Sequence, residues 1–299
     1  MSVVVPRDAS TVMLVRDATA GSAQACSTVM QVLLLRRNDR STWVAGVHLF
    51  PGGAVDDEDA SDEIARFCAG RSDAEASRIL GVPAGGRKFF VAAVRECFEE
   101  AGILLALAGN GKALSLRDPE VARRFGGYRR RLNNGEVQLH EICAAESLAL
   151  DLRGVGYFSH WITPEGSPRR YDTRFFVARV PEEQEALHDD AEVVASMWIE
   201  PARAIERHRA GEIELWLPTL RNLEAIATFP GTAELLAAVS VAEDPRLPLR
   251  LAAEGEGARI LLPTDEGYEE ALGLQTEAGS PRGGARAESL HHSRGPGSD

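Results

Sequence analysis

The segment that most constrains the fold is RKFFVAAVRECFEEAGILLA, residues 87–106, which has the apolar spacing of an amphipathic helix. Helical residues three and four positions apart share a face, so Glu96, Glu99 and Glu100 fall within an arc of roughly 100°. Gly102 allows the chain to leave the helix. Neighbouring glutamates repel one another unless a cation neutralises them. Two interpretations follow: a solvated acidic face, or carboxylates gathered around a divalent cation, which prefers oxygen ligands.

Strand patterns lie on both sides of this helix. We expect strands at five places, 10–18, 27–37, 157–164, 169–180 and 192–201. Further helices are expected at 201–213 and 218–229, and a late hairpin at 249–263. This order predicts a mixed α/β or α+β fold with layered helices.

Composition divides the chain into a folded part and a tail. We expect a single domain over residues 8–271 and a disordered tail over 272–299, because the tail is rich in Gly, Pro, Ser and charge. The acidic, Ala/Gly-rich segment 54–86 looks like an insertion carrying two short helices.

Charge and cysteine usage limit the partners. A net charge of −12 and a pI near 5.2 argue against nucleic-acid or anionic-membrane partners. No apolar run approaches the roughly 18 residues of a membrane helix, and the N-terminus does not read as a secretory signal. The four cysteines form no C-x-x-C pair, which favours thiols in a reducing cytoplasm. Cys97 is interpreted as small core filling.

The acidic helix resembles the second half of the Nudix hydrolase signature, G-x5-E-x7-R-E-u-x-E-E-x-G-u. The matching residues are Arg95, Glu96, Cys97, Glu99, Glu100, Gly102 and Ile103. The leading glycine would be Gly53, which lies 42 positions before Arg95 instead of the family's 14. The family's first glutamate would fall on Arg87, so that acid is either missing or supplied by Asp56, Asp57, Glu58 or Asp59.

An interrupted signature is similar to the Nudix branch of peroxisomal-type coenzyme A diphosphatases. Four segments resemble that branch in the same order: 33–53, 161–176, 192–201 and 214–223. The resemblance implies a Nudix-type α/β/α sandwich and metal-dependent hydrolysis of a nucleoside diphosphate linked to another moiety, with coenzyme A or acyl-coenzyme A favoured. The alternatives are NADH, ADP-ribose or dinucleoside polyphosphates as substrate, or a nucleotide sensor without turnover. A small-molecule nucleotide is the expected partner, and the chain could also form a homodimer.

The resemblance also assigns roles to residues. Glu96, Glu99 and Glu100, with the Gly52 carbonyl, would be ligands of Mg²⁺ or Mn²⁺. Arg95 would orient a glutamate, the alternative being an exposed helix salt bridge. Glu192 is our choice of general base, with Asp189 and Asp190 as alternatives, and a solvated loop acid is the competing interpretation.

Arginines and aromatics are the candidates for substrate contact. Arginine suits bidentate contacts with phosphate, which selects Arg36, Arg37, Arg169 and Arg170. Phe50 and Trp161 would stack on adenine or pantetheine, unless they are core residues. The segment YRRRL (128–132) is interpreted as a solvated helix face, and His160 and His188 as structural histidines.

Overall fold

The computed structural model describes residues 4–20, 27–38, 46–163, 169–186, 193–239, 249–251 and 259–261. The chain divides into two compact units, 1–247 and 248–299. In the second unit, β11 (Leu249–Leu251) pairs antiparallel with β12 (Arg259–Leu261), inside the range expected for a hairpin. The predicted disordered tail, 272–299, lies outside the described residues, as do Cys26 and the segment 187–192.

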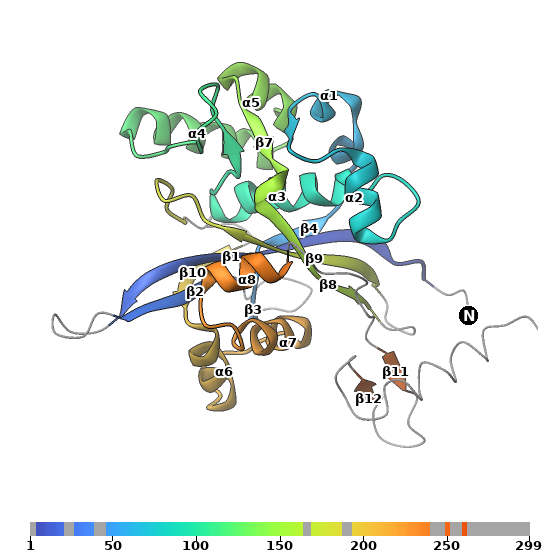
Figure 1. The fold of residues 1–299 in the computed structure, drawn as a ribbon, viewed down its shortest axis with the longest axis vertical. Helices are drawn as coiled ribbons and strands as arrows, with labels where there is room; N and C mark the ends of the chain where they lie inside the picture. The colour runs from blue at the N-terminus through green and yellow to red at the C-terminus, as the bar shows by residue number, and fades with distance from the viewer. Residues whose placement is uncertain are drawn as a thin grey trace, which may run out of the picture. The chain divides into compact units, whose positions relative to one another are not determined.

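A mixed sheet forms the centre of the first unit (Figure 1). Its strands are β1 (Arg7–Ala20), β2 (Ser27–Arg37), β8 (Val155–Ile162), β9 (Tyr171–Arg179) and β10 (Val193–Ile199), in the order β10-β2-β1-β9-β8. β1 and β9 run parallel, and the other neighbours in this order are antiparallel. Two short strands, β3 (His48–Leu49) and β4 (Gly52–Ala54), pair with β2 and β1. The five strand predictions are confirmed to within a few residues.

Alternation along β1 divides the core between the two faces of the sheet. Successive strand side chains point to opposite faces. Val12 and Leu14 accordingly belong to the core that contains α3 (Arg87–Ala101), whereas Met13 and Val15 belong to the other core. The second core is covered by α6 (Pro201–Arg209), α7 (Leu217–Ile226) and α8 (Thr232–Val239). The expected α/β/α sandwich is confirmed.

The remaining helices gather on the α3 side of the sheet (Figure 1). They are η1 (Asp57–Ala60), α1 (Asp62–Ala65), α2 (Asp73–Leu80), α4 (Pro119–Asn133), α5 (Leu139–Glu146) and η2 (Leu152–Gly154). A small sheet accompanies them, built from β5 (Cys68–Ala69), β7 (Ala149–Asp151) and β6 (Ala106–Leu107). The two short helices expected within 54–86 are α1 and α2.

α3 ends earlier than the apolar pattern indicates. The helical pattern was assigned to 87–106 with a possible exit at Gly102, and the structure takes that exit, because the last helical residue is Ala101. Gly102 adopts a left-handed conformation with φ of 71°, and its N–H and that of Ile103 turn back onto the carbonyls of Phe98 and Cys97. The apolar residues after the glycine therefore continue the core as extended chain.

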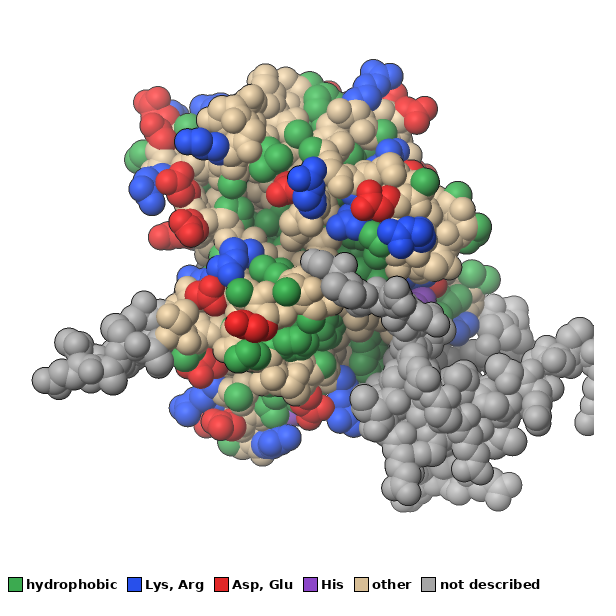
Figure 2. Space-filling view, viewed as in Figure 1, with side chains coloured by type: hydrophobic (Ala, Val, Ile, Leu, Met, Phe, Trp, Pro, Cys, Tyr) green, Lys and Arg blue, Asp and Glu red, His purple; other side chains and the backbone are tan. Residues whose placement is uncertain are grey.

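The surface carries charges of both signs. On the face shown in Figure 2, acidic and basic side chains are interspersed over the helical layers and do not separate into large single-sign patches. Among the described helices, none has both the length and the apolar run needed to cross a bilayer.

Candidate active site

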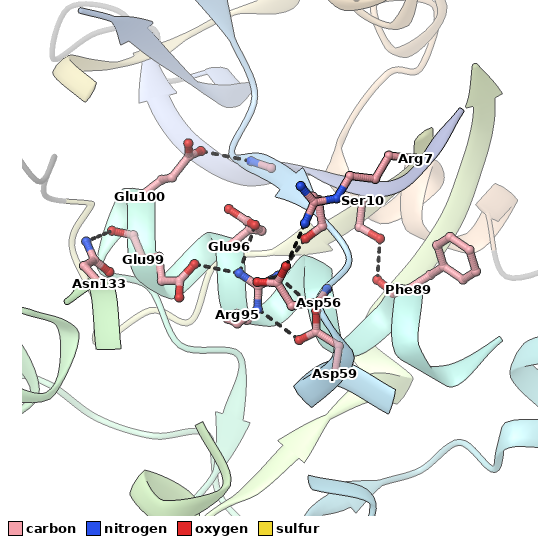
Figure 3. Close-up of polar contacts among 12 residues, drawn as sticks. Arg7, Ser10, Asp56, Asp59, Phe89, Arg95, Glu96, Glu99, Glu100 and Asn133 are labelled. Carbon is pink, nitrogen blue, oxygen red and sulfur yellow. Dashed lines mark hydrogen bonds and ion pairs between the residues drawn. The ribbon is translucent and has the colours of Figure 1, made fainter. Parts of the chain in front are cut away.

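The acidic side of α3 faces the glycines of β4 and the turn η1 that follows β4 (Figure 3). β4 is held in the sheet by antiparallel pairing with the first half of β1, where Gly52 lies opposite Thr11 and Gly53 opposite Ser10. Ser10 also donates its hydroxyl hydrogen to the Phe89 carbonyl, near the start of α3. The sheet thus fixes both the glycines and the helix that carries the glutamates.

Arg95 is the centre of the polar network (Figure 3). Its Nη1 donates to Glu96 Oε1 at 2.9 Å and to Glu99 Oε2 at 2.7 Å, and its Nη2 donates to the Ala54 carbonyl at 2.8 Å. Only 8% of the side chain is exposed. The alternative interpretation of Arg95 as an exposed helix salt bridge is therefore wrong.

Asp59 occupies the remaining side of the Arg95 guanidinium. Its two carboxylate oxygens accept from Nε and Nη2, each at 2.9 Å. Of the four acids proposed for this position, Asp59 is the buried one, with 2% of its side chain exposed, whereas Asp56, Asp57 and Glu58 are exposed. The turn η1 is responsible, because Asp59 Oδ2 also accepts from the backbone N–H of Asp56.

Asp59 also has the spacing from Gly53 that the signature gives its first acid. Asp59 stands six residues after Gly53, which is the interval that the Nudix signature gives its first acid. Counted from Gly53, the signature therefore has its first acid at Asp59 and its extra residues after it, whereas counted back from Arg95 it has that acid at Arg87. The bounds 54–86 of the insertion stay a prediction.

The two glycines allow the closest approaches in the site. A Cβ built on Gly53 would lie 2.4 Å from Glu96 Oε1, a distance that real Cβ atoms do not tolerate. The Gly52 N–H donates to Glu100 Oε2 at 2.9 Å. The bare backbone of β4 therefore lies directly against two of the three glutamates.

Negative charge exceeds positive charge in this network. Burial raises the pKa of the Glu96 carboxyl to about 7, with Arg95 opposing the rise and Glu99 adding to it. Burial also raises the pKa of Glu99 and of Asp59, against the opposing effect of Arg95. One guanidinium therefore serves several half-buried or buried carboxylates, an arrangement that an additional cation would stabilise.

The donor set suits a hard divalent cation. Carboxylate and backbone oxygens are the ligands that Mg²⁺ and Mn²⁺ prefer. Within the described residues, no three acidic, histidine or cysteine side chains already converge as a metal shell. Instead Glu96 and Glu99 face Arg95, and Glu100 faces Gly52. The residues fit the cation by their chemistry and their surplus charge, and binding requires these side chains to reorient.

The aromatic candidates for substrate contact are placed in or against the core. Phe50 is 1% exposed and packs with the second core, so its ring is not available for stacking and that prediction is wrong. Trp161 is half-buried and packs against the same core. This arrangement favours the interpretation of both residues as core.

The four candidate arginines form two adjacent pairs, Arg36 and Arg37 at the end of β2 and Arg169 and Arg170 directly before β9. Arg36 and Arg37 end β2, where they pair with β10 and, for Arg36, with His48 of β3. Arg170 donates to the backbone carbonyls of Thr163 and Val4, so backbone acceptors already engage its guanidinium. Their roles in phosphate binding stay predictions.

The proposed general bases lie outside the described residues. This applies to Glu192, Asp189 and Asp190, and also to His188. His160 is described, and it pairs with Asp172 between β8 and β9, as expected of a structural histidine. Cys97 is buried, which confirms that it fills the core.

One contact with the acidic helix was missed by reasoning from the sequence. Arg129 lies within YRRRL but is buried, and its Nε donates to the backbone carbonyl of Glu99 at 2.8 Å. The available signal was its spacing, because Arg129 falls four residues after Phe125 and three before Leu132, on the buried stripe of α4. The interpretation of this segment as a solvated face is therefore wrong at Arg129.

Known proteins are similar to this chain in sequence and in fold. The family described as the NUDT19 Nudix domain matches residues 80–226. The acyl-coenzyme A diphosphatase NUDT19 of Gallus gallus is 30% identical over 280 residues, covering 80% of this chain and 73% of the relative. The Homo sapiens protein of the same name is 29% identical over 276 residues, covering 80% and 72%. The crystal structure of a Nudix hydrolase from Alicyclobacillus acidocaldarius superposes with a TM-score of 0.59 at 25% identity, covering 80% of this chain and 99% of that one.

Proposed function

This chain belongs to the Nudix hydrolase family, and from that premise we propose that it hydrolyses the diphosphate linkage of coenzyme A and acyl-coenzyme A. The products would be 3′,5′-ADP and 4′-phosphopantetheine or its acyl form. The relatives named acyl-coenzyme A diphosphatase support the choice of substrate. The observation that carries the chemistry is the group of three glutamates against the glycines of β4, of which Glu96 and Glu99 contact Arg95 and Glu100 contacts Gly52.

In the proposed reaction, water attacks one phosphorus atom and the bridging P–O bond breaks. The attacked phosphate gains the water oxygen, the other phosphate leaves with the bridging oxygen, and a base accepts the released proton. Glu96, Glu99 and Glu100 would hold Mg²⁺ or Mn²⁺ near the diphosphate. When bound, such a cation neutralises the phosphate charge and activates water. Glu192 is our proposal for the base.

Arg95 and Asp59 would hold the metal-binding glutamates in place. Arg95 donates one nitrogen to both Glu96 and Glu99, which keeps the two carboxylates together despite their repulsion. Asp59 fixes the guanidinium from its other side. Buried partners that orient ligands in this way are worth about 10–100-fold in metal affinity or activity.

The rival interpretation is a nucleotide sensor without turnover, and the presence of Glu96, Glu99 and Glu100 argues against it. An absent first acid in the signature would faintly favour a sensor, and the contact of Asp59 with Arg95 speaks against that absence. Other nucleoside diphosphate compounds, namely NADH, ADP-ribose and dinucleoside polyphosphates, stay as outcomes of the substrate test.

The test is product analysis with purified protein, Mg²⁺ or Mn²⁺ and a panel of coenzyme A, acetyl-coenzyme A, NADH, ADP-ribose and diadenosine polyphosphates. Glu100→Gln is the inactivating variant, and Glu58→Gln, an exposed acid of η1, is its matched control. Release of 3′,5′-ADP from coenzyme A by the wild type and the control, with loss in Glu100→Gln, is the expected result. Cleavage of another compound alone would overturn the substrate assignment, and binding without any turnover would overturn the enzyme.

A cytoplasmic location is part of the same proposal. Its support is that Cys68, Cys97 and Cys143, the cysteines within the described residues, are free thiols, as is usual in a reducing compartment. Fractionation of the source cells, followed by detection of the protein with an antibody, tests this location. Recovery in a membrane-bounded organelle fraction would contradict it.

A further inference from the structure

The C-terminal end of α3 is capped from another helix. The last carbonyls of a helix lack partners within it. The N–H groups of Gly102 and Ile103 serve the carbonyls of Phe98 and Cys97 at 3.0 and 3.4 Å. The next carbonyl, that of Glu99, is served by side chains of α4.

Two residues of α4, Arg129 and Asn133, donate hydrogen bonds to the Glu99 carbonyl, and the contact of Asn133 is drawn in Figure 3. Arg129 Nε donates to Glu99 O at 2.8 Å, and Asn133 Nδ2 donates to the same oxygen at 3.3 Å. The two residues are four positions apart and so share one face of α4. Arg129 is 9% exposed, which places a buried cation at the end of α3 where the helix dipole favours positive charge.

The contact matters because Glu99 is then held at both ends. Its carboxylate accepts from Arg95 Nη1 at 2.7 Å, and its backbone carbonyl accepts from Arg129 at 2.8 Å. Glu100 is the next residue, so the same contact also fixes the backbone that carries it. Metal and substrate sites need their groups held to within about 0.5 Å.

We propose that Arg129, assisted by Asn133, is a positioning residue that sets the metal-binding geometry of Glu99 and Glu100 through the Glu99 carbonyl. The role of the metal rests on the proposed function, but the contact itself does not. α4 would thereby connect the helical layer on the α3 side to the active site. Arg129 would touch neither substrate nor metal.

Arg129→Gln tests the proposal, with Arg123→Gln as control, an exposed arginine of the same helix. The first readout is Mn²⁺ affinity by calorimetry without substrate, together with Tm. We expect the Mn²⁺ dissociation constant of Arg129→Gln to rise roughly 10–100-fold, as for other residues that orient ligands, while the control stays at the wild-type value. Arg129→Lys, which keeps the charge, should recover part of the loss.

A double variant separates positioning from general destabilisation. If Arg129 acts through the Glu99 backbone, Arg129→Gln should weaken Mn²⁺ binding less in a Glu99→Gln background, where only its effect on Glu100 remains, than in the wild type. Additive losses in the two backgrounds would overturn the proposal. Asn133→Ala, at an exposed position, serves if Arg129→Gln does not fold, and should weaken Mn²⁺ binding in the same direction. The proposal would also be overturned if the two single variants Arg129→Lys and Asn133→Ala both fold and both bind Mn²⁺ with wild-type affinity.

The readouts keep this proposal distinct from the proposed function. The Mn²⁺ measurement needs no turnover, so a wild type that binds Mn²⁺ but leaves coenzyme A intact would refute the substrate assignment alone. Where coenzyme A is cleaved, kcat at saturating Mn²⁺ and substrate gives a second readout. We expect kcat to fall in Arg129→Gln with little change in KM, because the substrate contacts are intact.

Discussion

Asp59 and Arg95 form a two-bond ion pair whose side chains are 2% and 8% exposed, although 36 positions separate them in the sequence. Both oxygens of Asp59 and two nitrogens of Arg95 are used, the geometry in which an arginine–carboxylate pair is strongest. The pair joins the turn after β4 to the middle of α3. The helices inserted between them therefore leave the geometry of the acidic site in place.

Removing the Asp59 carboxylate should destabilise the protein strongly. In Asp59→Ala, Arg95 would keep its buried charge but lose its most buried partner. Breaking a buried pair from one side costs about 3–5 kcal/mol. Urea unfolding followed by circular dichroism measures the loss, and Asp57→Ala, exposed on the same turn, should change the free energy of unfolding by less than about 0.5 kcal/mol. A loss in Asp59→Ala no larger than that of the control would show that the pair is unimportant.

The two glycines of β4 should respond differently to alanine. In Gly53→Ala the new methyl group would meet the carboxylate of Glu96 at 2.4 Å, and this flexible side chain can move away. We expect activity to fall roughly 10–100-fold because a ligand is displaced, with a modest change in Tm. Steady-state kinetics beside a thermal scan checks both parts.

Gly52→Ala provides the contrast. Its methyl group would lie 2.5 Å from the backbone carbonyl oxygen of Ser10, which is fixed in β1. We expect a lower Tm, since overpacking against a rigid backbone costs about 1–3 kcal/mol. The reverse pattern, with Gly53→Ala unstable and Gly52→Ala merely inactive, would contradict the placement of β4 against Glu96.

Divalent cations should stabilise the folded protein. A cation that binds the folded state alone stabilises it by about 2.7 kcal/mol at one hundred times its dissociation constant. For a domain of this size, saturating Mn²⁺ should therefore raise Tm by about 5–10 °C relative to EDTA. Glu100→Gln should lose most of this shift, whereas Glu58→Gln should keep it. The same Tm for the wild type in Mn²⁺ and in EDTA would argue that the glutamates hold no cation.

Local periodicity explains what could be predicted from the sequence. The acidic arc and apolar stripe of α3 are properties of one helix, so Glu96, Glu99 and Glu100 were found without the fold. The strands were found for the same reason, because alternation is local. The exit at Gly102 was found in the same way, although the apolar residues continue past it to residue 106 and extended the assigned range.

The rest of the site depends on contacts between distant segments. The choice of Asp59 among four neighbouring acids is made by the turn η1, which buries one of them against Arg95. Arg129 was hidden in a run of arginines, where charge suggested solvent and the helical spacing pointed inward. Phe50 follows a strand near the glycines, but it faces the core opposite to α3. Sequence position alone did not reveal that direction.

The contacts of Asp172 with His160 and Arg174 should make the stability of the protein depend on pH. Burial alone would raise the pKa of Asp172, but the hydrogen bonds and charges of His160 and Arg174 outweigh it and lower the pKa below its ordinary value. A carboxyl whose pKa is lower in the folded than in the unfolded state stabilises the protein at pH values above its unfolded pKa of about 3.9. This stabilisation is lost as the pH falls through the folded pKa.

Asp172→Asn should therefore lower the free energy of unfolding by about 1–3 kcal/mol at pH 7. Its difference from the wild type should shrink steadily below about pH 4. Urea unfolding at a series of pH values from 7 down to 3 measures both curves, with Asp57→Asn as the exposed control. A difference that stays constant across this range would show that the charge on Asp172 does not contribute to stability.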